Sequence, residues 1–104
     1  MITRIVQLEF QEDKVEDFLR FFDEIKDLVN NFPGCCGMKL YQDIQRPTII
    51  ITYSHWENEE ALNNYRNSEI FGNVWPGIKP WFGGKPQAWS VHAYFDGFRE
   101  KIKK

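Results

Sequence analysis

The spacing of apolar and polar residues predicts a strand followed by a helix in the first third of the chain. Residues 2–10 end in an alternation of apolar and polar side chains, which is typical of a strand with one covered face. Over residues 15–29, apolar side chains recur at helical spacing, and Pro33-Gly34 predicts the end of that helix. The covered face of the strand would carry Val6, Leu8 and Phe10.

Two further strands are predicted over residues 35–44 and 48–56. In the second of these, alternation places Thr52 and Trp56 on one face and His55 on the opposite face. Both faces of this strand carry isoleucines or aromatic residues, so neither face is suited to contact with water. We therefore expect each face of this strand to be covered.

The rest of the chain predicts a divided helix and a last strand. Asn58 suits the N-cap of the helix, and Asn67-Ser68 interrupts it before a short continuation that ends at Trp75. Pro76-Gly77 is expected to break the chain into irregular turns. The last strand is predicted over residues 87–95.

The order of elements, βαββαβ, predicts a ferredoxin-like α+β fold with two helices on one face of a four-stranded antiparallel sheet. We expect one domain over residues 1–104, with a basic C-terminal tail at 96–104. An apolar second face of the sheet would be a liability on a monomer, so we expect a homodimer joined face to face. The tail would place Phe98 or Ile102 on the partner.

Composition and charge exclude several classes of partner. The formal net charge of −2 argues against general binding to nucleic acid or to acidic membranes. No apolar run approaches the ~20 residues of a membrane span, and no signal peptide is recognisable, so we expect a cytoplasmic protein. No His or Cys cluster has the spacing of a metal site. The nine Phe, four Trp and four Tyr need more partners than one small core usually offers.

The segment from Ile51 to Phe71 resembles the antibiotic biosynthesis monooxygenase family, in which a strand ends in Trp and a capped helix follows. The residues that carry the resemblance are Trp56, Ala61, Tyr65, Ser68 and Phe71. The resemblance implies a dimeric ferredoxin-like α+β barrel. It also implies, as in several members, oxidation of a phenol or quinol by molecular oxygen without a bound cofactor.

The resemblance implies that Trp56 lies in the substrate pocket. Thr52 shares its face of the strand and can form hydrogen bonds. Thr52 stands where the quinone-forming members have Asn, and Leu62 stands where they have Tyr. The haem-degrading branch fits less well, because residues 2–10 contain no Asn and no His lies between His55 and His92. The residues expected to bind a small aromatic substrate are Trp56, Thr52, Trp75, Tyr65 and Phe22.

His55 and His92 are the side chains whose ordinary pKa suits proton transfer near neutral pH, so both are weak candidates for a catalytic role. Two other kinds of protein fit the same pattern. One is a non-catalytic dimer that binds a small molecule, for example in a stress response. The other is an interaction module whose aromatic residues fill the core and the dimer seam, which would leave no open space beside Trp56.

Overall fold

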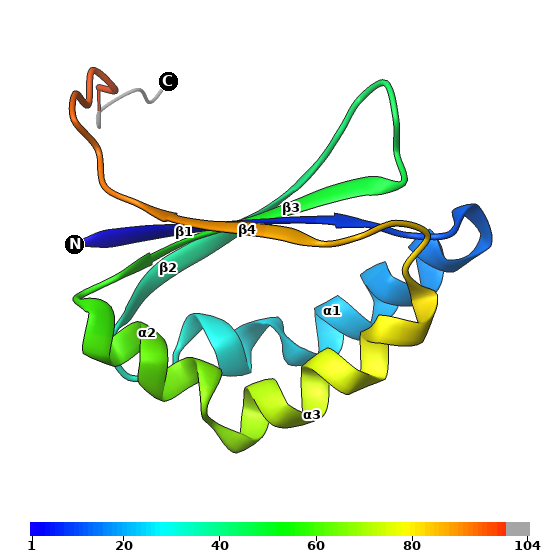
Figure 1. Cartoon of the computed structure of the whole chain (residues 1–104), viewed down its shortest axis with the longest axis horizontal. Coiled ribbons are helices and arrows are strands. Elements are labelled where there is room, and N and C mark those ends of the chain that lie inside the picture. Colours follow the sequence, from blue (N-terminus) through cyan, green and yellow to red (C-terminus); the bar gives the residue numbers. More distant parts are fainter. Residues whose placement is uncertain (100–104) are drawn as a thin grey trace.

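The computed structural model describes residues 1–99 and has the predicted α+β architecture, with every helix on one side of a single sheet (Figure 1). The sheet is antiparallel and has the strand order β2-β3-β1-β4, which is the ferredoxin-like order. Its strands are β1 (Ile2–Glu9), β2 (Cys35–Gln42), β3 (Ile49–Trp56) and β4 (Gln87–Val91). The helices are α1 (Val15–Asn30), α2 (Glu59–Arg66) and α3 (Glu69–Ile78), with short 3-10 turns at Glu12–Lys14 and Lys79–Trp81.

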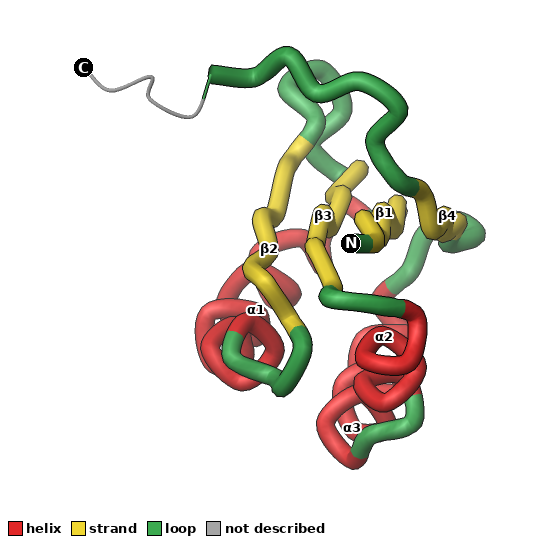
Figure 2. The backbone as a smooth tube through the Cα atoms, turned by 90° about the vertical axis from the view of Figure 1, so that its left-hand side faces the viewer, coloured by secondary structure: helices red, strands yellow, loops and turns green. Residues whose placement is uncertain are grey.

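The helices pack against one face of the sheet in two separate groups. Figure 2 shows α1 beneath β2, and α2 and α3 on the same face of the sheet but beneath β1 and β4. Their buried side chains form two clusters at different places on the sheet. The first contains Leu8, Phe10, Val15, Phe18, Ile50 and Ile78, and the second contains Trp56, Ala61 and Leu62.

Local hydrogen bonds explain why α2 and α3 are two helices. The Asn58 Oδ1 accepts from the Ala61 backbone N–H at 2.8 Å, which caps α2. The Ser68 Oγ accepts from the Phe71 backbone N–H at 3.2 Å, which caps α3. Figure 1 shows that the two helices meet at an angle, with their junction turned away from the sheet. The interruption predicted at Asn67-Ser68 is confirmed.

The prediction that Pro76-Gly77 would break the chain was wrong, because α3 continues through both residues to Ile78. The fixed φ of proline is itself helical, and a proline near the last turn removes a single backbone hydrogen bond. Ile78 is buried in the first cluster, and the free energy gained by that burial offsets the lost bond.

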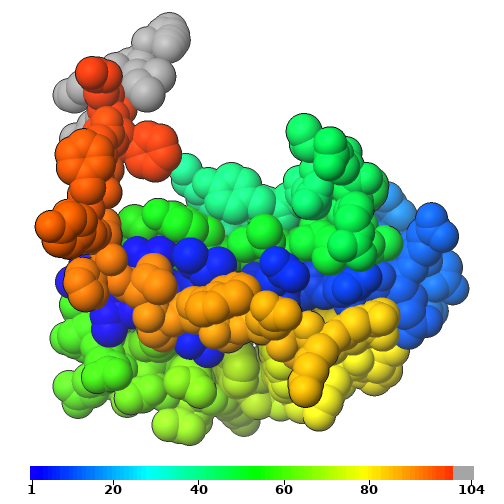
Figure 3. All heavy atoms as spheres, turned by 45° about the horizontal axis from the view of Figure 1, so that its top comes forward, coloured from blue at the N-terminus to red at the C-terminus, as the bar shows by residue number. Residues whose placement is uncertain are grey.

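The last strand is shorter than predicted, since β4 ends at Val91 and not at residue 95. Val91 pairs with Thr3, and β1 begins only one residue earlier, so later residues have no strand to pair with. Residues 92–99 leave the sheet on the side opposite the helices (Figure 3). We call residues 92–99 the arm. Ile102, which was expected to reach a partner, lies outside the described residues.

Gly34 joins α1 to β2 and lies in close contact with Ala61 of α2. Its φ of +87° is unfavourable for other residues, and a Cβ added there would collide with the Ala61 Cβ. We expect Gly34→Ala to lower the free energy of unfolding in urea by about 2–4 kcal/mol.

The collision can be separated from the backbone strain with a double-mutant cycle. Ala61→Gly removes the opposing Cβ, so Gly34→Ala should cost less in an Ala61→Gly background than in the wild type. Equal costs in the two backgrounds would contradict this packing.

Candidate functional site

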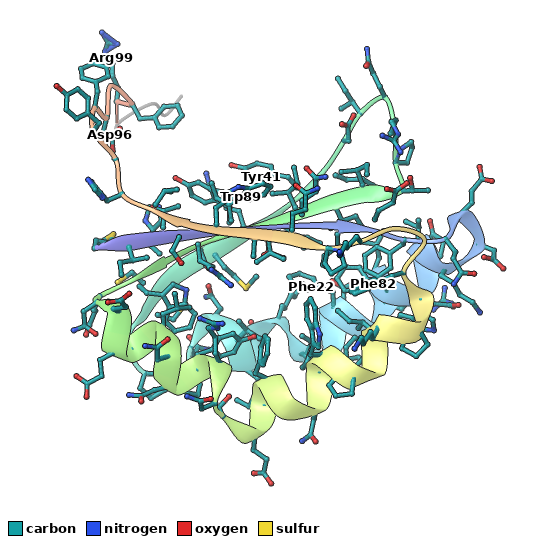
Figure 4. The ribbon with its side chains drawn as sticks, viewed as in Figure 1. Phe22, Tyr41, Phe82, Trp89, Asp96 and Arg99 are labelled. Atoms are coloured by element: carbon teal, nitrogen blue, oxygen red, sulfur yellow. The ribbon has the colours of Figure 1, made fainter. Side chains whose placement is uncertain are left out.

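A cavity of about 570 Å³ lies between the helices and the sheet, and side chains from both core clusters line it. This volume is within the range of small-molecule sites in proteins. Phe22 reaches into this space from α1 (Figure 4). An open space beside Trp56 is incompatible with the interaction module, whose aromatic residues would fill it.

The structure brings all five predicted substrate-binding residues together around this cavity. Thr52 and Trp56 come from β3, Phe22 from α1, Tyr65 from α2 and Trp75 from α3. They were expected there from strand alternation, helical spacing and the family resemblance.

Trp56 has a structural contact on one side and the cavity on the other. Its side chain is 1% exposed, and its Nε1 donates to the Ser54 Oγ at 3.0 Å. Its ring stacks on Tyr65 with centroids 5.1 Å apart and meets Phe32 edge to face. These contacts fix the orientation of the indole, so it forms a rigid wall of the cavity.

At the end of the cavity formed by α3, the wall consists of packed aromatic side chains. Trp75 stacks on Phe71 with centroids 5.8 Å apart. Phe82, which follows the second 3-10 turn, packs against both Trp75 and Phe10 at centroid distances of 5.6 and 5.4 Å. The resulting wall is apolar and large enough to cover the face of an aromatic ligand.

Arg4, which was not among the residues expected at the site, also lines the cavity from β1. In the sheet it lies between Ser54 of β3 and Ser90 of β4. Partial burial, followed by repulsion from the Arg66 guanidinium, lowers the pKa of Arg4. The signal was present in the sequence, because alternation places Arg4 on the same face as Val6.

Tyr65 is the one phenol that residues 1–99 contribute to the cavity wall. Burial, and to a smaller degree the neighbouring Cys35 thiol, raises the pKa of Tyr65 to about 12. The hydroxyl is therefore protonated at neutral pH, so it can donate a hydrogen bond but cannot serve as a base.

Neither histidine lies at the cavity. His55 is on the opposite face of β3, where its Nε2 lies 3.1 Å from the Tyr53 hydroxyl oxygen. His92 follows β4 in the exposed arm. The geometry does not support the catalytic roles considered for these residues. Within residues 1–99, no three His, Cys, Asp or Glu side chains gather as a metal site would require. No helix in the same range is both long and apolar enough to cross a membrane.

Because the pKa of Tyr65 is raised in the folded protein, the free energy of unfolding should fall as the pH becomes alkaline. Since the pKa of about 12 in the folded protein is above the ordinary value of 10.0 for tyrosine, the wild type keeps this stabilisation below pH 10 and loses it as the pH approaches 12. We expect a loss of roughly 2–3 kcal/mol in the free energy of unfolding across that interval. Tyr65→Phe should lack this component when urea unfolding is followed at each pH, and an unchanged slope would contradict the assignment.

Solved structures share this fold over almost their whole length. A crystal structure of an antibiotic biosynthesis monooxygenase superposes with a TM-score of 0.83 at 19% identity, covering 89% of this chain and 98% of the other. A conserved protein from Methanosarcina mazei Go1 gives a TM-score of 0.81 at 18% identity, covering 88% and 91%. Rv0793 from Mycobacterium tuberculosis gives 0.83 at 12% identity, covering 93% and 98%. At these identities the likeness shows the fold alone.

The family itself is shown by sequence. Among curated proteins, none matches the chain. The sequence model of one family does match, under the description antibiotic biosynthesis monooxygenase, and it covers residues 1–74 of the 104. The match includes β1, α1, β2, β3 and α2, and therefore most of the strand and helix residues that line the cavity. This chain belongs to the antibiotic biosynthesis monooxygenase family.

Proposed function

We propose that the protein is a monooxygenase that oxidises a small phenol or quinol with molecular oxygen and without a bound cofactor. The single observation that supports this most is the aromatic cavity beside Trp56 in a chain of this family. An electron-rich aromatic ring can itself reduce oxygen once it is deprotonated. The protein then has to hold the ring, shield it from water and favour its anionic form.

The proposed reaction balances without an added reductant. A phenol with a free ring C–H and one molecule of oxygen give a quinone and one molecule of water. One oxygen atom forms the new C=O bond at the ring carbon, and the other leaves as water. The four electrons that reduce oxygen all come from the substrate.

Each cavity residue has a role in this proposal that follows from its chemistry. The ring of Trp56 is stacked on Tyr65 and held by Ser54, so it gives the cavity a fixed aromatic wall beside which the substrate binds. The Thr52 hydroxyl, four residues before Trp56 on the same face of β3, donates a hydrogen bond to the phenolate oxygen. Tyr65, protonated at neutral pH, can donate a second one.

We also propose a homodimer in which the helix-free faces of two sheets meet. Tyr41 and Trp89 project from this face (Figure 4), and Trp89 is 43% exposed. The arm continues beyond it and presents Tyr94, Phe95 and Phe98 almost fully exposed. A second copy would cover these apolar side chains, and the arm is placed to extend along it.

Oxygen uptake tests the reaction. With a panel of hydroquinones and phenols and no added cofactor, we expect enzyme-dependent oxygen consumption measured with an oxygen electrode. Thr52→Val keeps the shape of the side chain and removes its hydroxyl, so it should lower kcat/KM by about 10-fold. Trp56→Phe should lower it as well, because the smaller ring leaves the wall incomplete.

Thr3→Val is the matched control, because it makes the same chemical change on the opposite face of β1 and should leave the rate unchanged. If the phenols bind, seen as quenching of tryptophan fluorescence, but no oxygen is consumed with any of them, the non-catalytic binding protein is the correct alternative. Equal rates for the wild type and both cavity variants would contradict the assignment of the site.

Sedimentation velocity tests the dimer. We expect a particle of twice the 12.4 kDa chain mass at micromolar concentration. Trp89→Glu places a charge in the proposed interface and should weaken association by at least about 10-fold. Leu28→Glu adds the same charge at a residue of α1 that is 55% exposed, and it should leave the dimer intact. A wild-type particle of one chain would contradict the proposal.

A further inference from the structure

The charge on the cavity wall has a single sign. The ionisable side chains that line the cavity are two arginines, Arg4 and Arg66, and the phenol of Tyr65. No Asp or Glu from residues 1–99 is part of that wall. The whole chain has a net charge of −2, so this positive wall does not follow from an excess of basic residues.

Arg4 departs from the pattern of its strand. Its neighbours on the same face of β1 are Val6 and the buried Leu8, so alternation would place an apolar side chain at this position. The Arg4 Nη1 donates to the Ser90 Oγ at 2.9 Å, which occupies one of the five N–H donors of the guanidinium. Ser90 is neutral, so the positive charge of Arg4 is not balanced by this contact.

Neither arginine has an acidic partner within the described part of the chain. The four ion pairs found over residues 1–99 involve Lys14, Arg20, Lys26 and Arg46. Arg66, in the last turn of α2, lies close enough to Arg4 for the two charges to repel each other. Arg4 is partly buried and Arg66 is exposed, so water screens part of this repulsion, and an anion bound between the two guanidinium groups would remove the rest.

We propose that this end of the cavity binds a carboxylate on the aromatic substrate, with Arg4 as the main ligand and Arg66 as a second cation. The inference rests on the proposed function for the choice of an aromatic substrate, and it narrows the substrate class to hydroxyaryl carboxylates. Planar guanidinium groups match the two oxygens of a carboxylate. Asn63 lines the cavity one helical turn before Arg66 and adds an amide donor on the same side of α2.

The two ends of the cavity would then orient the ligand. The carboxylate would lie between β1 and the C-terminal end of α2, and the ring would extend toward Phe22 and Trp75. Thr52 of β3 lies opposite Val6 of β1, and Val6 is two residues from Arg4 on the same face of the sheet. A hydroxyl on the same ring as the carboxylate can therefore reach Thr52 while the carboxylate contacts Arg4.

A pair of ligands that differ in charge tests the inference by binding alone. The ligands are 3-hydroxy-2-naphthoate and its methyl ester, and affinity is measured by quenching of tryptophan fluorescence and by calorimetry. We expect the wild type to bind the acid at least about 10-fold more tightly than the ester. Raising the salt concentration should weaken binding of the acid more than binding of the ester.

Substitutions of single arginines test which positive charge produces the preference for the acid. Arg4→Gln should abolish the preference for the acid, and Arg66→Gln should reduce it several-fold. Arg4→Lys keeps the charge and should retain part of the preference, which guards against a fold defect in Arg4→Gln. Arg20→Gln removes a positive charge from the outer face of α1, where Arg20 pairs with Asp17, and should change nothing. Equal affinities of the wild type for acid and ester, or binding of neither, would overturn the inference.

The result is independent of the proposed reaction. Preference for the acid without oxygen consumption by any hydroxyaryl carboxylate would support the anion site and contradict the monooxygenase. Oxygen consumption with neutral hydroquinones, together with no preference for the acid, would support the monooxygenase and contradict the anion site.

Discussion

The cavity depends on one constraint, which is that the paired helices α2 and α3 contact the sheet at separate places. The break at Asn67-Ser68 gives each helix its own capped start, and each packs on its own buried cluster through Leu62 or Ile78. The junction turns away from the sheet (Figure 1). A single straight helix would place side chains in the space that is now open, so the interruption in the sequence is the physical origin of the cavity.

The ionisable groups of the wall limit what kind of chemistry the cavity can support. Among residues 1–99, the ionisable side chains of the wall are the protonated Tyr65 phenol and two arginines, and neither kind of group is a proton acceptor. The proposed reaction therefore cannot rely on a general base from the wall, and the substrate has to lose its proton to bulk water before the cavity shields the ring. What the wall offers is stabilisation of an anion, by positive charge and hydrogen-bond donors that are already in place before the ligand arrives.

Strand alternation made the sheet predictable from sequence. It also predicted that Thr52 and Trp56 share one face of their strand and that His55 lies on the opposite face. The period of two leaves no freedom once a strand is recognised. Helix packing was less predictable, because the same apolar spacing suits a filled core and an open cavity. Pro76 was misjudged since its cost was assessed locally, whereas the burial of Ile78 acts through tertiary contacts. Arg4 was overlooked because a single charge within a short strand is easily assigned to the solvent face.

The proposed dimer and the cavity share β4, so dimer assembly would be coupled to the site. β4 pairs with β1 alone, and all five of its residues are exposed in the single chain. An exposed edge strand of this length is held weakly. Gln87 and Ala88 of β4 line the cavity. Ser90 of the same strand accepts the hydrogen bond that orients Arg4. Covering Trp89 and Val91 with a second copy would fix the strand, and the same contact would hold Arg4 in the position that the anion site requires.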